Sequence, residues 1–142
     1  MLKIFNLIYR LALGIKPYAR FVFFAWLLII LGYTIVPNPE GSEGIRLDKG
    51  IIRLDYLIHF VSFCFLSLLY CLWFANVKLK INISYLIYAI APSIILAFLL
   101  EYVQQYVEGR SYNEIDFLFN GLGALSGLFI YFFFSRSLEK RA

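Results

Sequence analysis

Charged and amide side chains interrupt the chain between Glu101 and Gly127, within a sequence otherwise dominated by long apolar runs. A single charge at the centre of a bilayer costs about 2.5 to 3.5 kcal/mol on insertion scales, so polar groups in such runs usually pair, face a cavity or lie at an interface. The polar residues of this stretch are Glu101, Gln104, Gln105, Glu108, Arg110, Asn113, Glu114, Asp116 and Asn120. Their density indicates that they have a specific role.

Helical spacing sorts the most deeply placed polar residues into three pairs, each near the end of a different apolar run. The pairs are Asp55 with His59, Glu101 with Gln104, and Asp116 with Asn120. Residues three or four apart share one face of a helix. We therefore expect the three pairs to meet at one depth and to form a polar pocket.

His59 is the only histidine of the chain and follows Asp55 by one helical turn. A carboxylate at this distance could orient the imidazole ring and favour its charged form, which suits a general base. A lone histidine in an apolar helix is equally compatible with a hydrogen-bonded core residue. The candidates for catalysis are thus His59, Asp55 and Glu101, with both interpretations left open.

Arg110 lies between the third and fourth apolar runs, where two roles are open to it. A guanidinium group matches the geometry of phosphate and carboxylate, which favours anion recognition. It could instead pair with Glu101 or Asp116 and fix the loop. Ser111 and Glu114 match a capping box, which predicts Ser111 as the N-cap of the fourth span.

A metal site made from carboxylates and one imidazole is conceivable by residue type, because such ligands suit hard or borderline divalent ions. Its members would be Asp55, His59, Glu101 and Asp116. Their spacing does not match a zinc signature, so the sequence predicts no metal and no other cofactor.

Gly123 and Gly127 form a GxxxG pattern inside the last apolar run. Small residues at this spacing let a second helix approach closely. We predict a helix-packing role for both glycines.

The composition indicates an integral membrane protein. Of 142 residues, 62% are hydrophobic and 15% charged, and the mean hydropathy is +0.78, whereas soluble domains are about 45 to 50% apolar and about 25% charged. The basic residues stand at the ends of apolar runs rather than in one patch, which argues against nucleic-acid binding. Cys64 and Cys71 lie about 10 Å apart along one helix, so they cannot form a disulfide with each other.

The chain divides into an N-terminal helix, residues 1–16, and a domain of four transmembrane helices, residues 17–142. In the first segment Lys3, Asn6 and Arg10 stand at helical spacing against apolar residues, a pattern typical of an amphipathic helix at the membrane interface, and Pro17 ends it. The fold class is therefore all-α, a four-helix membrane bundle with an interfacial helix. The predicted spans are Phe21–Val36, Asp55–Ala75, Ser84 to about Val107, with a kink at Pro92, and Ile115–Phe134.

Basic residues are more numerous on the side of the membrane that would hold both termini, which places the termini in the cytoplasm. Eight of the nine acidic residues fall on the outer side with this topology. The polar pocket should then open outward.

Three motifs together resemble the VanZ-like family of small bacterial membrane proteins. They are D-x-x-x-H-F (Asp55, His59, Phe60), E-x-x-Q (Glu101, Gln104) and R-x-x-x-x-x-D-x-x-x-N-x-x-G (Arg110, Asp116, Asn120, Gly123). The similarity covers the second to fourth spans. It implies a protein of the bacterial cell envelope, in the cytoplasmic membrane, and the founding member of the family is associated with low-level resistance to the glycopeptide teicoplanin.

We expect the pocket to bind an anionic lipid or a lipid-linked glycan headgroup, so that membrane lipids or a lipid-linked envelope precursor would be partners. The predicted ligand-binding residues are Arg110, Asp116, Asn120, Gln104, Glu101 and His59. One alternative is an intramembrane enzyme that uses His59 as general base on an envelope lipid. Another is a structural subunit that docks a membrane protein through Gly123 and Gly127.

Overall fold

The computed structural model describes residues 2–37, 54–76 and 79–139, and all the regular structure in these ranges is helical. The elements are α1 (Leu2–Ile15), the 3₁₀ helix η1 (Lys16–Tyr18), α2 (Ala19–Ile35), α3 (Leu54–Phe74), α4 (Ile83–Gln104) and α5 (Glu114–Glu139). Four helical stretches of the described chain are long and apolar enough to cross a membrane. The protein is thus a multi-pass membrane protein.

The third and fourth helices that span the membrane end at other residues than the sequence predicted. Helix α4 ends at Gln104, about one turn before the predicted limit, whereas α5 continues past Phe134 to Glu139. Helix α4 runs through Pro92 without ending there. Helix α2 ends where predicted, because Val36 is extended (φ −72°, ψ 124°), as expected for a residue before proline.

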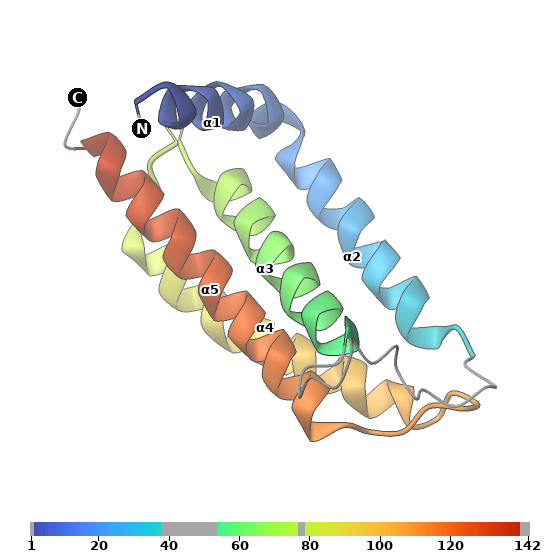
Figure 1. Cartoon of the computed structure of the whole chain (residues 1–142). Helices are drawn as coiled ribbons and strands as arrows, with labels where there is room; N and C mark the ends of the chain where they lie inside the picture. Colours follow the sequence, from blue (N-terminus) through green and yellow to red (C-terminus); the bar gives the residue numbers. More distant parts are fainter. Residues whose placement is uncertain (1, 38–53, 77–78, 140–142) are drawn as a thin grey trace.

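Helix α1 lies across one end of the bundle, and the chain turns at η1 into α2 (Figure 1). The turn contains Pro17, whose ring is tolerated at the start of a helical segment but not within one. Lys16 Nζ donates to the carbonyl of Trp73 at 3.2 Å. This bond ties the turn to the last residues of α3, where carbonyl groups lack helical partners.

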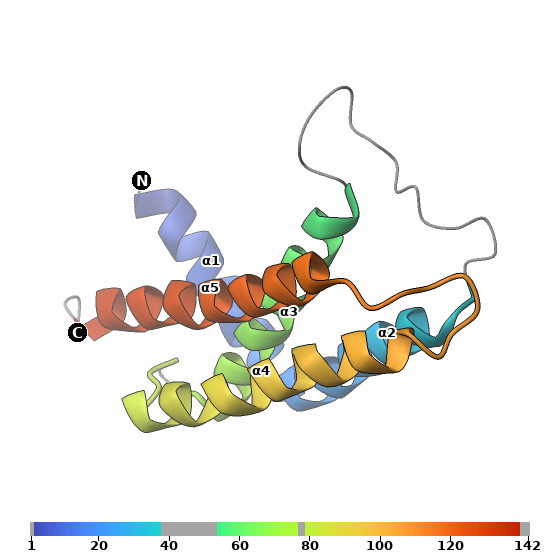
Figure 2. The ribbon, with the colours of Figure 1, turned by 90° about the horizontal axis from the view of Figure 1, so that it is seen from below.

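Helices α3 and α5 lie side by side (Figures 1 and 2). Gly123 and Gly127 face α3 so closely that a Cβ atom at either would overlap a backbone carbonyl oxygen, that of Phe60 or of Cys64 respectively. The GxxxG face is therefore filled by α3 of the same chain. A partner protein could dock through these two glycines only by displacing α3.

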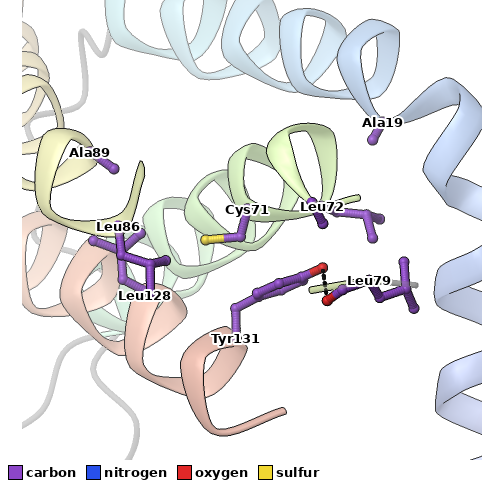
Figure 3. Close-up of a cluster of buried hydrophobic side chains, with 9 residues drawn as sticks. Ala19, Cys71, Leu72, Leu79, Leu86, Ala89, Leu128 and Tyr131 are labelled. Atoms are coloured by element: carbon purple, nitrogen blue, oxygen red, sulfur yellow. Dashed lines mark hydrogen bonds between the residues drawn. The ribbon is translucent and has the colours of Figure 1, made fainter. Parts of the chain in front are cut away.

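Buried apolar side chains form two clusters along the bundle. The cluster nearer α1 joins Ala19, Cys71, Leu72, Ala75, Leu79, Leu86, Ala89, Leu128 and Tyr131 (Figure 3). Tyr131 Oη donates to the carbonyl of Leu79 at 3.2 Å, and Ile81 N donates to Ser135 Oγ at 3.3 Å. Both bonds hold the connection between α3 and α4 against α5.

The second cluster lies under the other end of the bundle and consists of Ile30, Phe63, Leu66, Ala97, Leu100 and Ala124. Outside both clusters, large apolar side chains face the surroundings on every spanning helix, for example Leu28, Val61, Ile87 and Phe133. Several of the most deeply buried side chains, by contrast, are polar. This distribution is expected for a bundle in lipid, where the outer surface needs no polar groups.

The start of α5 is capped by Asn113, not by Ser111 as the capping-box pattern predicts. Asn113 Oδ1 accepts a hydrogen bond from Ile115 N at 3.0 Å, and its carbonyl accepts from Phe117 N. Asparagine is as good an N-cap as serine, and it stands directly before the first helical residue. Glu114 still lies in the first turn, beside the positive end of the helix dipole.

Candidate functional site

The polar residues gather at the end of the bundle opposite α1, where α2 and α4 end and α3 and α5 begin (Figure 1). The segment between α4 and α5 extends past the end of α2 before it returns to the bundle (Figure 2). Each of the three predicted pairs comes from one helix here: Asp55 and His59 from α3, Glu101 and Gln104 from α4, and Asp116 and Asn120 from α5.

A chain of hydrogen bonds crosses the three helices through Asn120. His59 Nδ1 lies 3.0 Å from Asn120 Oδ1, and Asn120 Nδ2 donates to Glu101 Oε1 at 3.1 Å. Glu101 is 0% exposed and Asn120 is 1% exposed, so neither side chain has access to bulk water. An unpaired polar group at such a position costs about 1 to 3 kcal/mol. The hydrogen bonds that pair these three side chains therefore contribute to the stability of the fold.

The directions of these bonds determine which nitrogen of His59 carries hydrogen. Asn120 Nδ2 donates to Glu101 Oε1, so the carbonyl oxygen of Asn120 is the atom that faces His59 Nδ1. That oxygen is an acceptor, so the hydrogen lies on Nδ1. In the neutral imidazole, Nε2 then presents a lone pair.

His59 Nε2 faces two carboxylates instead of a hydrogen-bond partner. Asp55 Oδ1 lies 3.7 Å and Asp116 Oδ2 lies 3.9 Å from it, beyond the 2.7 to 3.2 Å or so of an N–H···O bond. On the other side of the ring, Glu101 Oε1 lies 3.8 Å from Nδ1. The expectation that Asp55 orients the ring is therefore not met; Asn120 does so.

A partly open cavity of about 200 Å³ lies against this network. One wall is polar and includes His59, Glu101, Gln104 and Asn120, while α2 supplies an apolar wall with Trp26, Ile29, Ile30 and Tyr33. Glu101 Oε2 is buried without a hydrogen-bond partner among the described residues. Gln104, whose side chain lines the same cavity, is 4% exposed. The wall of the cavity thus includes a carboxylate oxygen, Glu101 Oε2, that could accept a hydrogen bond.

Arg110 is bound to α2 rather than to the acidic residues. Its Nε donates to the carbonyl of Val36 at 2.9 Å and its Nη2 to that of Tyr33 at 3.1 Å. The guanidinium carbon also lies 4.9 Å from the centre of the Tyr33 ring. The predicted pairing with Glu101 or Asp116 is absent, and no carboxylate within the described part of the chain forms an ion pair with Arg110.

Helix α2 contributes to the cavity in a way that the sequence analysis missed. Trp26 Nε1 donates to the carbonyl of Ser62 at 3.1 Å, and its ring packs edge-on against Phe65, which fixes α2 against α3. Thr34, which is 3% exposed, also lines the cavity. A buried hydroxyl in an otherwise apolar span was the one available signal. The groups that accept from Arg110 are backbone carbonyls, which every residue type has, so the sequence carries no signal for this contact.

Three side chains of the cluster could serve as metal ligands. One donor atom each from Asp55, His59 and Asp116 can be chosen so that all three lie within 4.8 Å of one another. Glu101 does not belong to this group, in contrast to the four-residue set that the sequence suggested.

Comparisons of the chain with protein-family models, with curated proteins and with solved structures found no match.

Proposed function

We propose that this protein is a VanZ-like component of the bacterial cytoplasmic membrane that binds the headgroup of an anionic lipid or of a lipid-linked glycan. The observation that carries the proposal is the contact of Arg110 with Tyr33, a residue that lines the cavity. Its guanidinium group rests on Tyr33, a residue of the cavity wall, and two of its N–H groups bind carbonyl oxygens of α2. Carbonyl groups do not neutralise the charge, and three N–H donors remain for a phosphate or carboxylate.

The polar wall of the cavity suits a different part of the same ligand. Glu101 Oε2 accepts hydrogen bonds but cannot donate them when ionised, and Gln104 can do both. Hydroxyl groups of glycerol or of a sugar would satisfy both side chains. We therefore infer a headgroup with its anion at Arg110 and its hydroxyl groups in the cavity.

The expected orientation of the chain in the membrane and the position of helix α1 also support the proposal. With both termini in the cytoplasm, as the distribution of Lys and Arg favours, the cavity opens towards the outer leaflet. Helix α1 packs Tyr9 and Ala12 against the bundle and leaves Leu7 and Leu11 exposed, which suits a helix resting in the inner interface.

The test is headgroup binding by the protein in lipid nanodiscs or by native mass spectrometry. The panel would compare phosphatidylglycerol, a polyprenyl-phosphate-linked sugar and zwitterionic phosphatidylcholine. We expect Arg110→Gln to weaken binding of the anionic members about tenfold or more, because hydrogen bonds to charged groups contribute about 1.5 to 3 kcal/mol. Arg20→Gln is a matched control, since Arg20 is exposed and also stacks on an aromatic ring, Phe21.

Arg110 also holds α2, so a second variant separates binding from folding. Gln104→Ala leaves the contacts of Arg110 intact and should weaken the hydroxyl-rich ligands more than a simple phosphate. Equal binding of every lipid phosphate by wild type and Arg110→Gln would rule out the proposed role.

A second candidate, an intramembrane enzyme acting on such a lipid, is favoured by one observation: His59 Nε2 makes no hydrogen bond to any described residue and faces carboxylates. Nε2 could take a proton from a nucleophile while Arg110 stabilises developing negative charge. This candidate predicts turnover of an envelope lipid that disappears in folded His59→Gln. Binding without turnover leaves the first proposal standing.

A further inference from the structure

A second cavity, of about 140 Å³, lies between the four spanning helices. None of the described residues that line it is charged: they are Phe23, Leu66, Ser67, Tyr70, Ala89, Pro92, Ser93, Leu96 and Leu128. A helical serine can bond to its own backbone, so the hydroxyl groups of Ser67 and Ser93 need no polar ligand. An apolar cavity of about 150 Å³ stays dry and binds a hydrocarbon such as benzene. The second cavity therefore suits hydrocarbon rather than water.

The second cavity continues the cavity beside His59, which is the headgroup cavity of the proposed function. The nearest lining residues of the two cavities are three or four positions apart on each of three helices: Phe23 and Trp26 on α2, Leu66 and Phe63 on α3, and Leu96 and Leu100 on α4. Residues at this spacing share one helix face and lie about 5 Å apart along its axis. The two cavities therefore follow one another along the same faces of α2, α3 and α4.

The combined length of the two cavities matches one leaflet of a bilayer. On α3 their lining extends from Ile58 to Tyr70, about 18 Å at the helical rise of about 1.5 Å per residue. One leaflet contributes about 15 Å, half of the hydrocarbon core. The second cavity is also partly open, and lipid surrounds the bundle at this depth, so a chain can enter from the side. The acyl chain of a glycerolipid has this reach, whereas the polyprenyl chain of a glycan carrier is much longer.

We propose that the second cavity holds one acyl chain of an anionic glycerolipid whose phosphate lies at Arg110. The inference rests on the proposed headgroup function and narrows it to one class of ligand. Lipid tails are as apolar as the cavity wall, so the chain gains little by leaving the bilayer. It gains by filling a void whose lining atoms otherwise lack van der Waals partners. The protein thereby selects a lipid-anchored anion over a free phosphate.

The experiment uses the full chain in nanodiscs that contain phosphatidylglycerol with a diazirine near the end of one acyl chain. After irradiation, mass spectrometry of peptides locates the label. We expect phosphatidylglycerol to label Phe23 and Leu96, which line the second cavity, several-fold more than phosphatidylcholine with the same chain does. Phe129, which is 60% exposed, should be labelled equally by both lipids.

Two outcomes of this comparison would overturn the proposal. One is equal labelling of Phe23 and Leu96 by the two lipids. The other concerns competition, in which unlabelled phosphatidylglycerol should displace the label from these residues more effectively than a polyprenyl phosphate does. The reverse order would assign the cavity to a prenyl chain instead.

Ser93→Leu fills part of the second cavity and should reduce the labelling of Phe23 several-fold. Ala91→Leu is the matched control, because it enlarges a small side chain in the same helical turn at an exposed position. Undiminished labelling in folded Ser93→Leu would contradict the acyl-chain site. If that variant fails to fold, the comparison of the two lipids in the wild-type protein decides alone.

Water-soluble glycerol phosphate tests the headgroup function separately, since this probe has no acyl chain. It should bind the wild-type protein and folded Ser93→Leu equally, and Arg110→Gln more weakly. Binding of glycerol phosphate without selective labelling of Phe23 and Leu96 would refute the acyl-chain site alone. Equal binding by wild type and Arg110→Gln would instead refute the headgroup function, and the pairing of chain and phosphate with it.

Discussion

Replacing Gly123 by alanine should destabilise the bundle, although alanine is the better helix former. A Cβ atom at Gly123 would overlap the carbonyl oxygen of Phe60. The same Cβ atom would lie only 2.9 Å from the carbonyl carbon of Phe60. These are backbone atoms of α3, which cannot rotate away as a flexible side chain could. Helices α3 and α5 must therefore separate, and overpacking of this kind typically costs about 1 to 3 kcal/mol.

Gly121 provides a control two residues away on the same helix. A Cβ there meets nothing within 4 Å, so Gly121→Ala should be neutral or stabilise by up to about 1 kcal/mol through helix propensity. Both variants gain the same helix propensity, so their free energies of unfolding should differ by the overpacking cost alone, about 1 to 3 kcal/mol.

The assay is reversible unfolding in mixed micelles, followed by circular dichroism and by tryptophan fluorescence. Trp26 is a suitable reporter because its indole nitrogen is bonded to α3. If Gly123→Ala were as stable as Gly121→Ala, the close packing of α5 on α3 described above would be incorrect. Gly127→Ala should also destabilise the bundle, because a Cβ atom there meets the backbone of Cys64. Gly123 instead meets Phe60, which is next to His59 in the sequence. The Gly127 variant should therefore disturb the polar site less than the Gly123 variant does.

Two further predictions concern the apolar end of the bundle. Tyr131→Phe removes the hydrogen bond to the Leu79 carbonyl and should lower the free energy of unfolding by about 1 kcal/mol; Tyr88→Phe, at a side chain that is 72% exposed, should have no measurable effect in the same titration. In a Cys64→Ala background, Cys71 is 0% exposed and should react with a maleimide only after unfolding, as followed by mass spectrometry. Labelling of the folded protein at the rate of an exposed thiol would contradict this burial.

Sequence reasoning located the four spans and the six residues of the three polar pairs because both depend on spacing along one helix. Apolar run length predicts a span, and separations of three or four residues predict a shared face. The structure brings five of those residues into one network of hydrogen bonds and close charges, and the sixth, Gln104, lines the adjacent cavity.

The sequence was less informative where a contact depends on the backbone or on competition between similar residues. Arg110 binds carbonyl groups at the end of α2, which any residue could present. Asn113 and Ser111 are both good N-caps, and the choice depends on where the chain leaves the loop. The orientation of His59 follows from Asn120, which is distant in sequence, rather than from Asp55, which is near.

The His59–Asn120 bond joins residues that are 61 positions apart, and this has a consequence for how the protein is made. At a synthesis rate of about 5 to 20 residues per second, Asn120 leaves the ribosome about 3 to 12 seconds after His59. During that interval α3 must reside in the translocon or the lipid with its imidazole still lacking the amide that later holds it. Assembly of the nascent chain thus depends on the arrival of its last helix.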